Sequence, residues 1–156
     1  AISMIRVFLL VSVLLLILSS ACSSQRTGGA DPKSRLQDYI SQSFAVSGAE
    51  DREALSKFLI GPAKTRLAAW SDEQFRSAFL ENKRQFIKLV FSEVRNLSPR
   101  EVSITYELTY LDQSKGHDAK VTHKKMAQLT QDRQQWFISD VRNLKELIEY
   151  NNEMAL

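Results

Sequence analysis

The hydrophobic residues of the chain follow three successive patterns. Residues 7–18 form an apolar run that only Ser12 interrupts. From residue 34 to about residue 83, apolar residues recur at intervals of three and four, which is the spacing of amphipathic helices. After Arg84 the interval becomes two, which is the spacing of half-buried strands. The order predicts a short apolar leader, then several helices, then a sheet.

The leader, residues 4–22, reads MIRVFLLVSVLLLILSSAC. Arg6 precedes the apolar run, and the small residues Ser19, Ser20 and Ala21 follow it, directly before Cys22. This order is typical of a secretion signal with a small-residue cleavage site. It resembles the lipobox of bacterial lipoproteins, although Ser19 stands where that motif usually has leucine. In those proteins lipid is attached to the cysteine and the signal is removed before it.

By this resemblance, residues 1–21 are a cleaved lipoprotein signal peptide and Cys22 is the lipid attachment site, through which acyl chains hold the protein on a membrane. Two alternatives stay open, a signal cleaved without lipidation and an uncleaved anchor. Twelve helical residues span about 18 Å, which is short for a hydrocarbon core of roughly 30 Å. The resemblance implies the bacterial cell envelope. Because Ser23 rather than aspartate follows the cysteine, it favours the outer membrane, facing the periplasm, over the inner membrane.

Residues 22–33 are small and polar, with a Gly-Gly pair and a proline, and predict a flexible tether before a single domain at residues 34–156. The first helix follows from the stripe of Leu36, Tyr39, Ile40 and Phe44. Four short motifs then predict helix boundaries: a capping box at Ser47 and Glu50, a stop at Gly61 and Pro62, a new start at Pro62, and a capping box at Ser71 and Gln74.

The clearest strand is residues 101–111, in which alternate residues form one apolar face: Val102, Ile104, Tyr106, Leu108 and Tyr110. Residues 86–94, 119–130 and 134–141 predict three more strands. The apolar phase of the first of these shifts between Phe91 and Val94, which predicts a β-bulge. The last apolar residues have helical spacing and predict a short closing helix: Leu144, Leu147, Ile148 and Met154.

Helices followed by a meander of strands predict an α+β fold, with the N-terminal helices packed on one face of a four-stranded antiparallel sheet. Four segments carry a resemblance to the nuclear transport factor 2-like (cystatin-like cone) superfamily over residues 34–142: the break at Gly61 and Pro62, the helix start SDEQF, the strand EVSITYELTY and the strand QQWFISDV. The resemblance implies a curved sheet that wraps around the helices as a cone whose mouth can hold a ligand. Some members are enzymes.

Charge and cysteine content narrow the possible partners. The chain has 21 Lys and Arg residues, of which only Arg6 precedes Cys22, and 18 Asp and Glu residues. This balance does not predict nucleic-acid binding. One cysteine cannot form an internal disulfide. Two histidines and a cysteine assigned to lipid provide no metal framework, so neither a metal nor another cofactor is expected.

Tyr106, Tyr110, Trp136 and His123 are the candidate pocket residues. Aromatic side chains with polar tips suit a small apolar ligand, and the same residues equally suit an ordinary core. His123 shares strand phase with Val121 and is expected to point inward. Sequence places no carboxylate beside it, so a structural and a catalytic role both stay open.

Two charged features have alternative interpretations. Lys115, Lys120, Lys124 and Lys125 form a basic strand, which either attracts anionic lipid head groups or keeps an exposed strand soluble. Asp140 shares strand phase with Trp136 and Ile138, and we expect it to cap the following helix rather than to face a pocket.

No catalytic residue is assigned, and three kinds of function remain. The first is a membrane-anchored, non-catalytic module that binds a small apolar ligand or an envelope protein. The second is an isomerase, dehydratase or hydrolase, which requires an inward carboxylate near His123. The third is a structural subunit of an envelope assembly, which predicts an exposed apolar patch of more than about 400 Å². The lack of a reactive set of residues favours the first.

Overall fold

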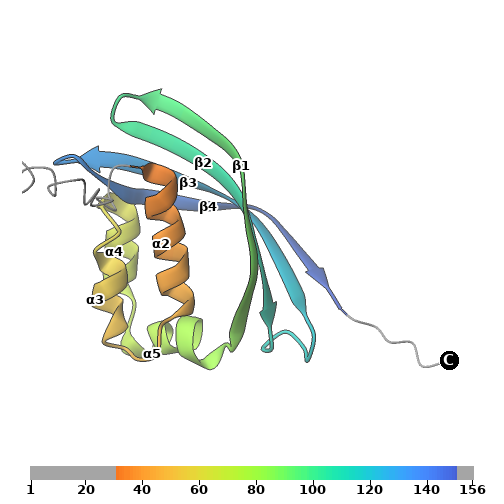
Figure 1. The fold of residues 1–156 in the computed structure, drawn as a ribbon. Helices are drawn as coiled ribbons and strands as arrows, with labels where there is room; N and C mark the ends of the chain where they lie inside the picture. Colours follow the sequence, from red (N-terminus) through yellow and green to blue (C-terminus); the bar gives the residue numbers. More distant parts are fainter. Residues whose placement is uncertain (1–30, 151–156) are drawn as a thin grey trace, which may run out of the picture.

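The computed structural model describes residues 31–150, so the leader and Cys22 lie outside the described residues. Within this range the fold is α+β, as predicted, with helices on the concave side of a bent sheet (Figure 1). The helical part comprises α2 (Pro32–Phe44), α3 (Asp51–Ser56), α4 (Gly61–Ala69), α5 (Asp72–Arg76) and a π-helical turn, η1 (Ser77–Glu81). The sheet comprises β1 (Arg84–Ser98), β2 (Glu101–Asp112), β3 (Lys120–Asp132) and β4 (Gln135–Glu149).

The four strands form an antiparallel meander in the order β1-β2-β3-β4. β2 and β3 pair without a register shift, whereas β1 contains three irregularities. One of these lies between Phe91 and Glu93, so the predicted bulge is confirmed. β4 has two register shifts, at Ser139 and Leu144, where one residue is skipped in the pairing with β3. Each skipped residue reverses which side chains of β4 face the helices.

The core lies between the concave face of the sheet and the helices. The predicted apolar face of β2 is buried throughout, and it meets buried residues of the helices, namely Leu36, Ile40, Leu55, Leu67 and Phe75. These residues belong to one cluster within residues 31–150. A continuous core in a range of this length is typical of a domain that folds on its own.

The helix boundaries follow the predicted motifs only in part. The capping box of Ser71 and Gln74 is present, with both reciprocal hydrogen bonds. The box predicted at Ser47 and Glu50 is wrong, because Asp51 accepts the backbone N–H groups of Ser47 and Gly48 instead, at 2.8 and 3.2 Å. Asp31 caps α2, whose first residue is Pro32, so the helix starts within the stretch predicted as tether.

Gly61 was predicted to end the second helix. In the structure it is instead the first residue of α4, with a φ of +58°. Between the two helices, residues 58–60 run parallel to β4. The Ile60 N–H donates to the Ile138 carbonyl oxygen at 3.0 Å, and the Ile138 N–H donates to the Phe58 carbonyl oxygen at 2.9 Å. Arg35 of α2 adds a hydrogen bond from Nε to the Trp136 carbonyl oxygen at 3.0 Å. These bonds cover part of the outer edge of β4.

The prediction of a short closing helix is wrong for the described residues. β4 extends to Glu149 and pairs with β3 as far as Lys120. Leu144 and Leu147 are about half exposed, with 52% and 50% of their surface accessible, whereas Ile148 packs against the core. Met154 lies outside the described residues.

Candidate functional site

A cavity of about 410 Å³ lies between the helices and the concave face of the sheet. Its apolar wall includes Ile40 of α2, Leu67 of α4, Phe79 of η1 and Tyr106 of β2. This volume lies within the range of small-molecule sites in proteins. Polar side chains from five different elements also reach the cavity, namely Ser43, Arg66, Arg84, Lys125 and Asn143.

Two tyrosine hydroxyl groups lie in this wall. Burial is the main cause that raises the pKa of Tyr106, and neighbouring Tyr39 raises it further. Burial also raises the pKa of Tyr39 itself, against a smaller opposing effect of Arg84. Both phenols are therefore neutral at physiological pH. They present hydroxyl groups to a ligand rather than negative charge.

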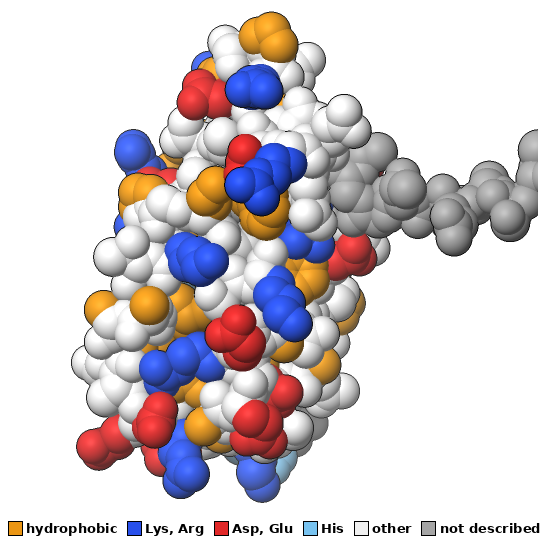
Figure 2. Space-filling view, turned by 90° about the vertical axis from the view of Figure 1, so that its left-hand side faces the viewer, with side chains coloured by type: hydrophobic (Ala, Val, Ile, Leu, Met, Phe, Trp, Pro, Cys, Tyr) orange, Lys and Arg blue, Asp and Glu red, His pale blue; other side chains and the backbone are white. Residues whose placement is uncertain are grey.

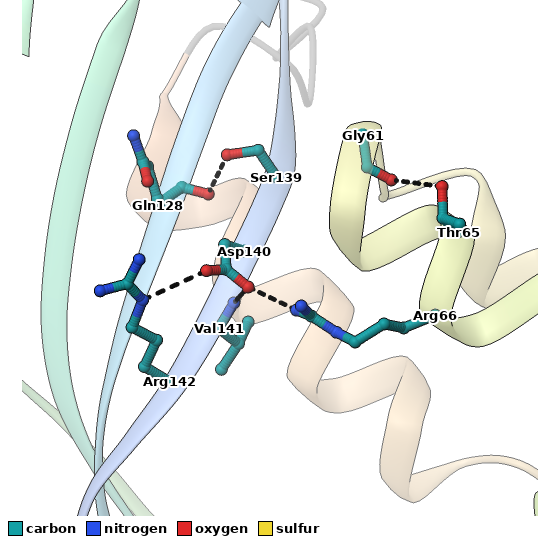
Figure 3. A network of polar contacts seen from close by, with 8 residues as sticks. All are labelled: Gly61, Thr65, Arg66, Gln128, Ser139, Asp140, Val141 and Arg142. Carbon is teal, nitrogen blue, oxygen red and sulfur yellow. Dashed lines mark hydrogen bonds and ion pairs between the residues drawn. The ribbon is translucent and has the colours of Figure 1, made fainter.

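Arg66 of α4 is neutralised by Asp140 of β4 (Figure 3). The carboxylate also accepts from Arg142 Nε at 3.3 Å and from the Val141 N–H at 3.0 Å. The hydrogen bond from Arg66 is the largest cause that lowers the pKa of Asp140. Asp140 therefore joins α4 to the middle of β4, beside the Ser139 bulge. The prediction that it caps a following helix is wrong, because the chain continues there as β4.

Arg84 and Lys125 form no ion pair with a carboxylate of residues 31–150. The Arg84 guanidinium lies over three aromatic rings, at 5.2 Å from the centre of Phe44, 5.4 Å from Phe79 and 5.7 Å from Tyr110. Lys125 lies opposite Tyr106 in the sheet. Burial lowers the pKa of Lys125, the positive charge of Arg84 lowers it further, and Glu146 opposes both effects.

The structure separates the four predicted pocket residues. Tyr106 lines the cavity. Tyr110 and His123 stack on each other beside it, with ring centres 5.8 Å apart and planes inclined by 16°. Trp136 lies elsewhere, near Pro32 and Val102 beside a separate pocket. Arg84 and Lys125 were not among the predicted residues, although Lys125 shares its strand phase with His123.

His123 points inward, as expected from its phase. The Leu144 bulge turns Glu146 to the same face, and Glu146 Oε1 lies 3.5 Å from His123 Nε2. This distance is longer than that of a good hydrogen bond. His123 Nδ1 is buried and has no hydrogen-bond partner. Burial, followed by the positive charge of Lys125, lowers the pKa of His123, so the imidazole is neutral at pH 7.

The lowered pKa of His123 predicts a dependence of stability on pH. Because the unfolded chain binds this proton more tightly, the contribution is fully present above the unfolded pKa of about 6.5 and is lost as the pH falls through the folded-state pKa. We expect the free energy of unfolding, measured with urea, to fall as the pH decreases below about 6.5. The His123→Gln variant should show a smaller decrease.

The control for this prediction is His117→Gln. The side chain of His117 is 97% exposed in the hairpin between β2 and β3. In this variant the free energy of unfolding should depend on pH as it does in the unaltered protein. If the two variants showed the same dependence, His123 would not be its source.

The basic strand is partly neutralised. Lys120 Nζ lies 3.1 Å from Glu149 Oε2, and Lys115 Nζ lies 3.4 Å from Glu146 Oε1. Figure 2 shows both signs of charge interspersed on the face that it presents. Within residues 31–150, no group of three or more potential metal-ligating side chains comes together, and no helix has the length and apolarity needed to cross a membrane.

Comparisons with known proteins concern the fold alone. No family model and no curated protein matches the sequence. A SEC-C motif containing protein from Rhodopseudomonas palustris, solved in solution, is similar with a TM-score of 0.55 and 12% identity, over 74% of this chain and 80% of that one. The crystal structure of the intermembrane space region of the chloroplast protein ARC6 is similar with a TM-score of 0.50 and 16% identity, over 73% of this chain and 96% of that one.

Proposed function

We propose that this chain is a bacterial envelope lipoprotein whose domain binds a small ligand without transforming it. The observation that supports binding is the cavity between helices and sheet, with an apolar wall and a few convergent polar groups. The leader and Cys22 support membrane attachment, and residues 23–30 would give the domain reach from the membrane surface. The cone-like superfamily named above remains our proposal for its ancestry.

Binding in the cavity predicts uptake of a neutral apolar dye. N-phenylnaphthylamine should bind the chain from residue 23 to residue 156 and gain fluorescence there. The Ala78→Phe variant should weaken its affinity by at least about tenfold, or about 1.4 kcal/mol, because Ala78 lines the cavity and the added ring fills it. The measurement is a fluorescence titration of each protein.

The matched control is Ala68→Phe, which makes the same change at an exposed position of α4. It should bind the dye like the unaltered protein. Absence of dye binding by the unaltered domain, or equal binding by both variants, would count against a ligand site between the helices and the sheet.

One observation favours a second candidate function, an enzyme of the isomerase, dehydratase or hydrolase type. His123 and Glu146 face inward together, as such a mechanism requires. A neutral imidazole can accept a proton from a substrate, and a carboxylate beside it can stabilise the resulting charge. The stacked Tyr110 ring lies on one face of the imidazole, and His123 is not part of the cavity wall, so we place this function second.

A further inference from the structure

The cavity contains more positive charge than the described residues neutralise. Three cationic side chains line it, and only Arg66 has a carboxylate partner. Arg84 is surrounded by aromatic rings, which attract its charge, and it also interacts with the Tyr110 hydroxyl group. Because a guanidinium has five N–H donors, donors remain for a further acceptor. Lys125 has no carboxylate partner among residues 31–150, because nearby Glu146 pairs with Lys115 and faces His123.

The two cations left unpaired within residues 31–150, Arg84 and Lys125, favour an anionic ligand in the cavity. Arg84 and Lys125 are both partly buried and both positive, and the charge of Arg84 makes the charged form of Lys125 less favourable. Burying like charges without a counter-charge is costly in a protein. An anion between them would relieve both effects, whereas a purely apolar ligand would remove water from the two cations without replacing it.

The rest of the cavity wall suits an anion with an apolar tail better than a small inorganic anion. Ile40, Leu67 and Phe79 offer an apolar surface next to the cations. A cavity of about 410 Å³ is far larger than one carboxylate and has room for an attached hydrocarbon tail. The planar guanidinium of Arg84 suits a carboxylate, which can accept two parallel hydrogen bonds from it.

We infer that the ligand is an anionic amphiphile, with a carboxylate head group bound by Arg84 and Lys125 and an apolar tail against Ile40, Leu67 and Phe79. This inference rests on the proposed function of the cavity as a binding site. It specifies the charge of the ligand, whereas the sequence suggested only a small apolar ligand or an envelope protein.

Three compounds with the same eight-carbon tail test the head group, namely octanoate, octanol and octylamine. Each competes with N-phenylnaphthylamine for the chain from residue 23 to residue 156. Octanoate should displace the dye at a concentration at least about tenfold lower than octanol, because a charge-assisted hydrogen bond contributes an effect of this size. Octylamine, which is positively charged at neutral pH, should be the weakest competitor.

The variant Lys125→Met keeps the length of the side chain and removes its charge. In it the preference of about tenfold for octanoate over octanol should disappear, with each competition corrected for that variant's own measured affinity for the dye. Arg84→Gln should have the same effect on the preference. Lys124→Met is the matched control, because Lys124 is the exposed neighbour on the opposite face of β3, and it should keep the preference unchanged.

Two results separate this inference from the proposed function. If the unaltered domain binds the dye but octanol competes as well as octanoate, the anionic ligand is refuted and the binding site remains. A preference that survives in both Lys125→Met and Arg84→Gln refutes it equally. If the dye does not bind the folded, unaltered domain, the proposed function itself fails. Far-ultraviolet circular dichroism establishes that each protein compared is folded.

Discussion

The Cys22→Ala variant is expected to lose all incorporation of palmitate, because the sulfur of Cys22 is the proposed attachment site. Each buried methylene group of an acyl chain contributes about 0.8 kcal/mol to membrane binding, so two or three chains hold a protein on a bilayer almost permanently. The measurement is metabolic labelling of cells with an alkyne analogue of palmitate, followed by detection on a gel. Ser23→Ala, one residue away, should be labelled like the unaltered protein.

Fractionation of cells completes this test. An uncleaved anchor at residues 7–18 is one of the alternatives left open above, so Cys22→Ala alone does not decide where the domain resides. A second variant carries residues 23–156 behind a secretion signal that is cleaved without lipidation, and we expect it in the soluble fraction. Label on Cys22→Ala would refute the anchor. So would a mature protein that keeps the apolar segment with an unmodified sulfur, as measured by mass spectrometry.

Phe75→Ala is expected to lower the free energy of unfolding by about 3–5 kcal/mol. Phe75 of α5 is fully buried, and its ring centre lies 4.8 Å from that of Phe79. Its removal would leave a void beneath η1, where the chain turns from the helices into β1. Urea unfolding, followed through the fluorescence of Trp70 and Trp136, measures the loss.

The matched control is Phe86→Ala. Phe86 of β1 is 47% exposed, although its ring contacts Phe44 edge-on at 5.7 Å. Its replacement should cost less than half as much as that of Phe75, because less apolar surface returns to water. Equal losses in the two variants would show that the core does not extend under α5 as described.

Signals that lie within a few residues predicted the fold well. The strict alternation of residues 101–111 predicted β2 and its buried face, and the pair Ser71 and Gln74 predicted the start of α5. In both cases the deciding interactions are local. The α+β architecture follows from the order of such segments along the chain.

The C-terminal strand was predicted wrongly because its deciding interactions are distant. A bulge adds one residue, so the inward positions of β4 are separated by three residues as well as two: Ile138, Val141, Asn143, Glu146 and Ile148. Of the described residues whose helical spacing predicted a closing helix, Leu144 is the bulged residue, Leu147 is about half exposed, and Ile148 alone is at one of these inward positions. Only the pairing with β3 distinguishes the two structures, and that pairing joins residues far apart in the sequence.

The candidate site was hidden for a related reason. A lysine in a polar strand and an arginine at the start of another are typical of solvated surface, and their local sequence contains nothing to the contrary. Arg84 and Lys125 line the same cavity, although they belong to different strands, because the sheet bends around the helices (Figure 1). The inward orientation of Tyr106 was predictable, because the alternation of its strand is regular and its side chain is buried.

The two edges of the sheet differ, and this difference limits how copies of the protein can associate. Residues 58–60 hydrogen-bond to one edge, at Ile138, whereas within residues 31–150 no strand pairs with the outer edge of β1. Fibre growth through sheets requires two free edges on every molecule, because each copy must accept one neighbour and offer itself to the next. Here residues 58–60 block such pairing only around Ile138 of β4, so a second copy can pair along the rest of β4 or along β1 but not at that end.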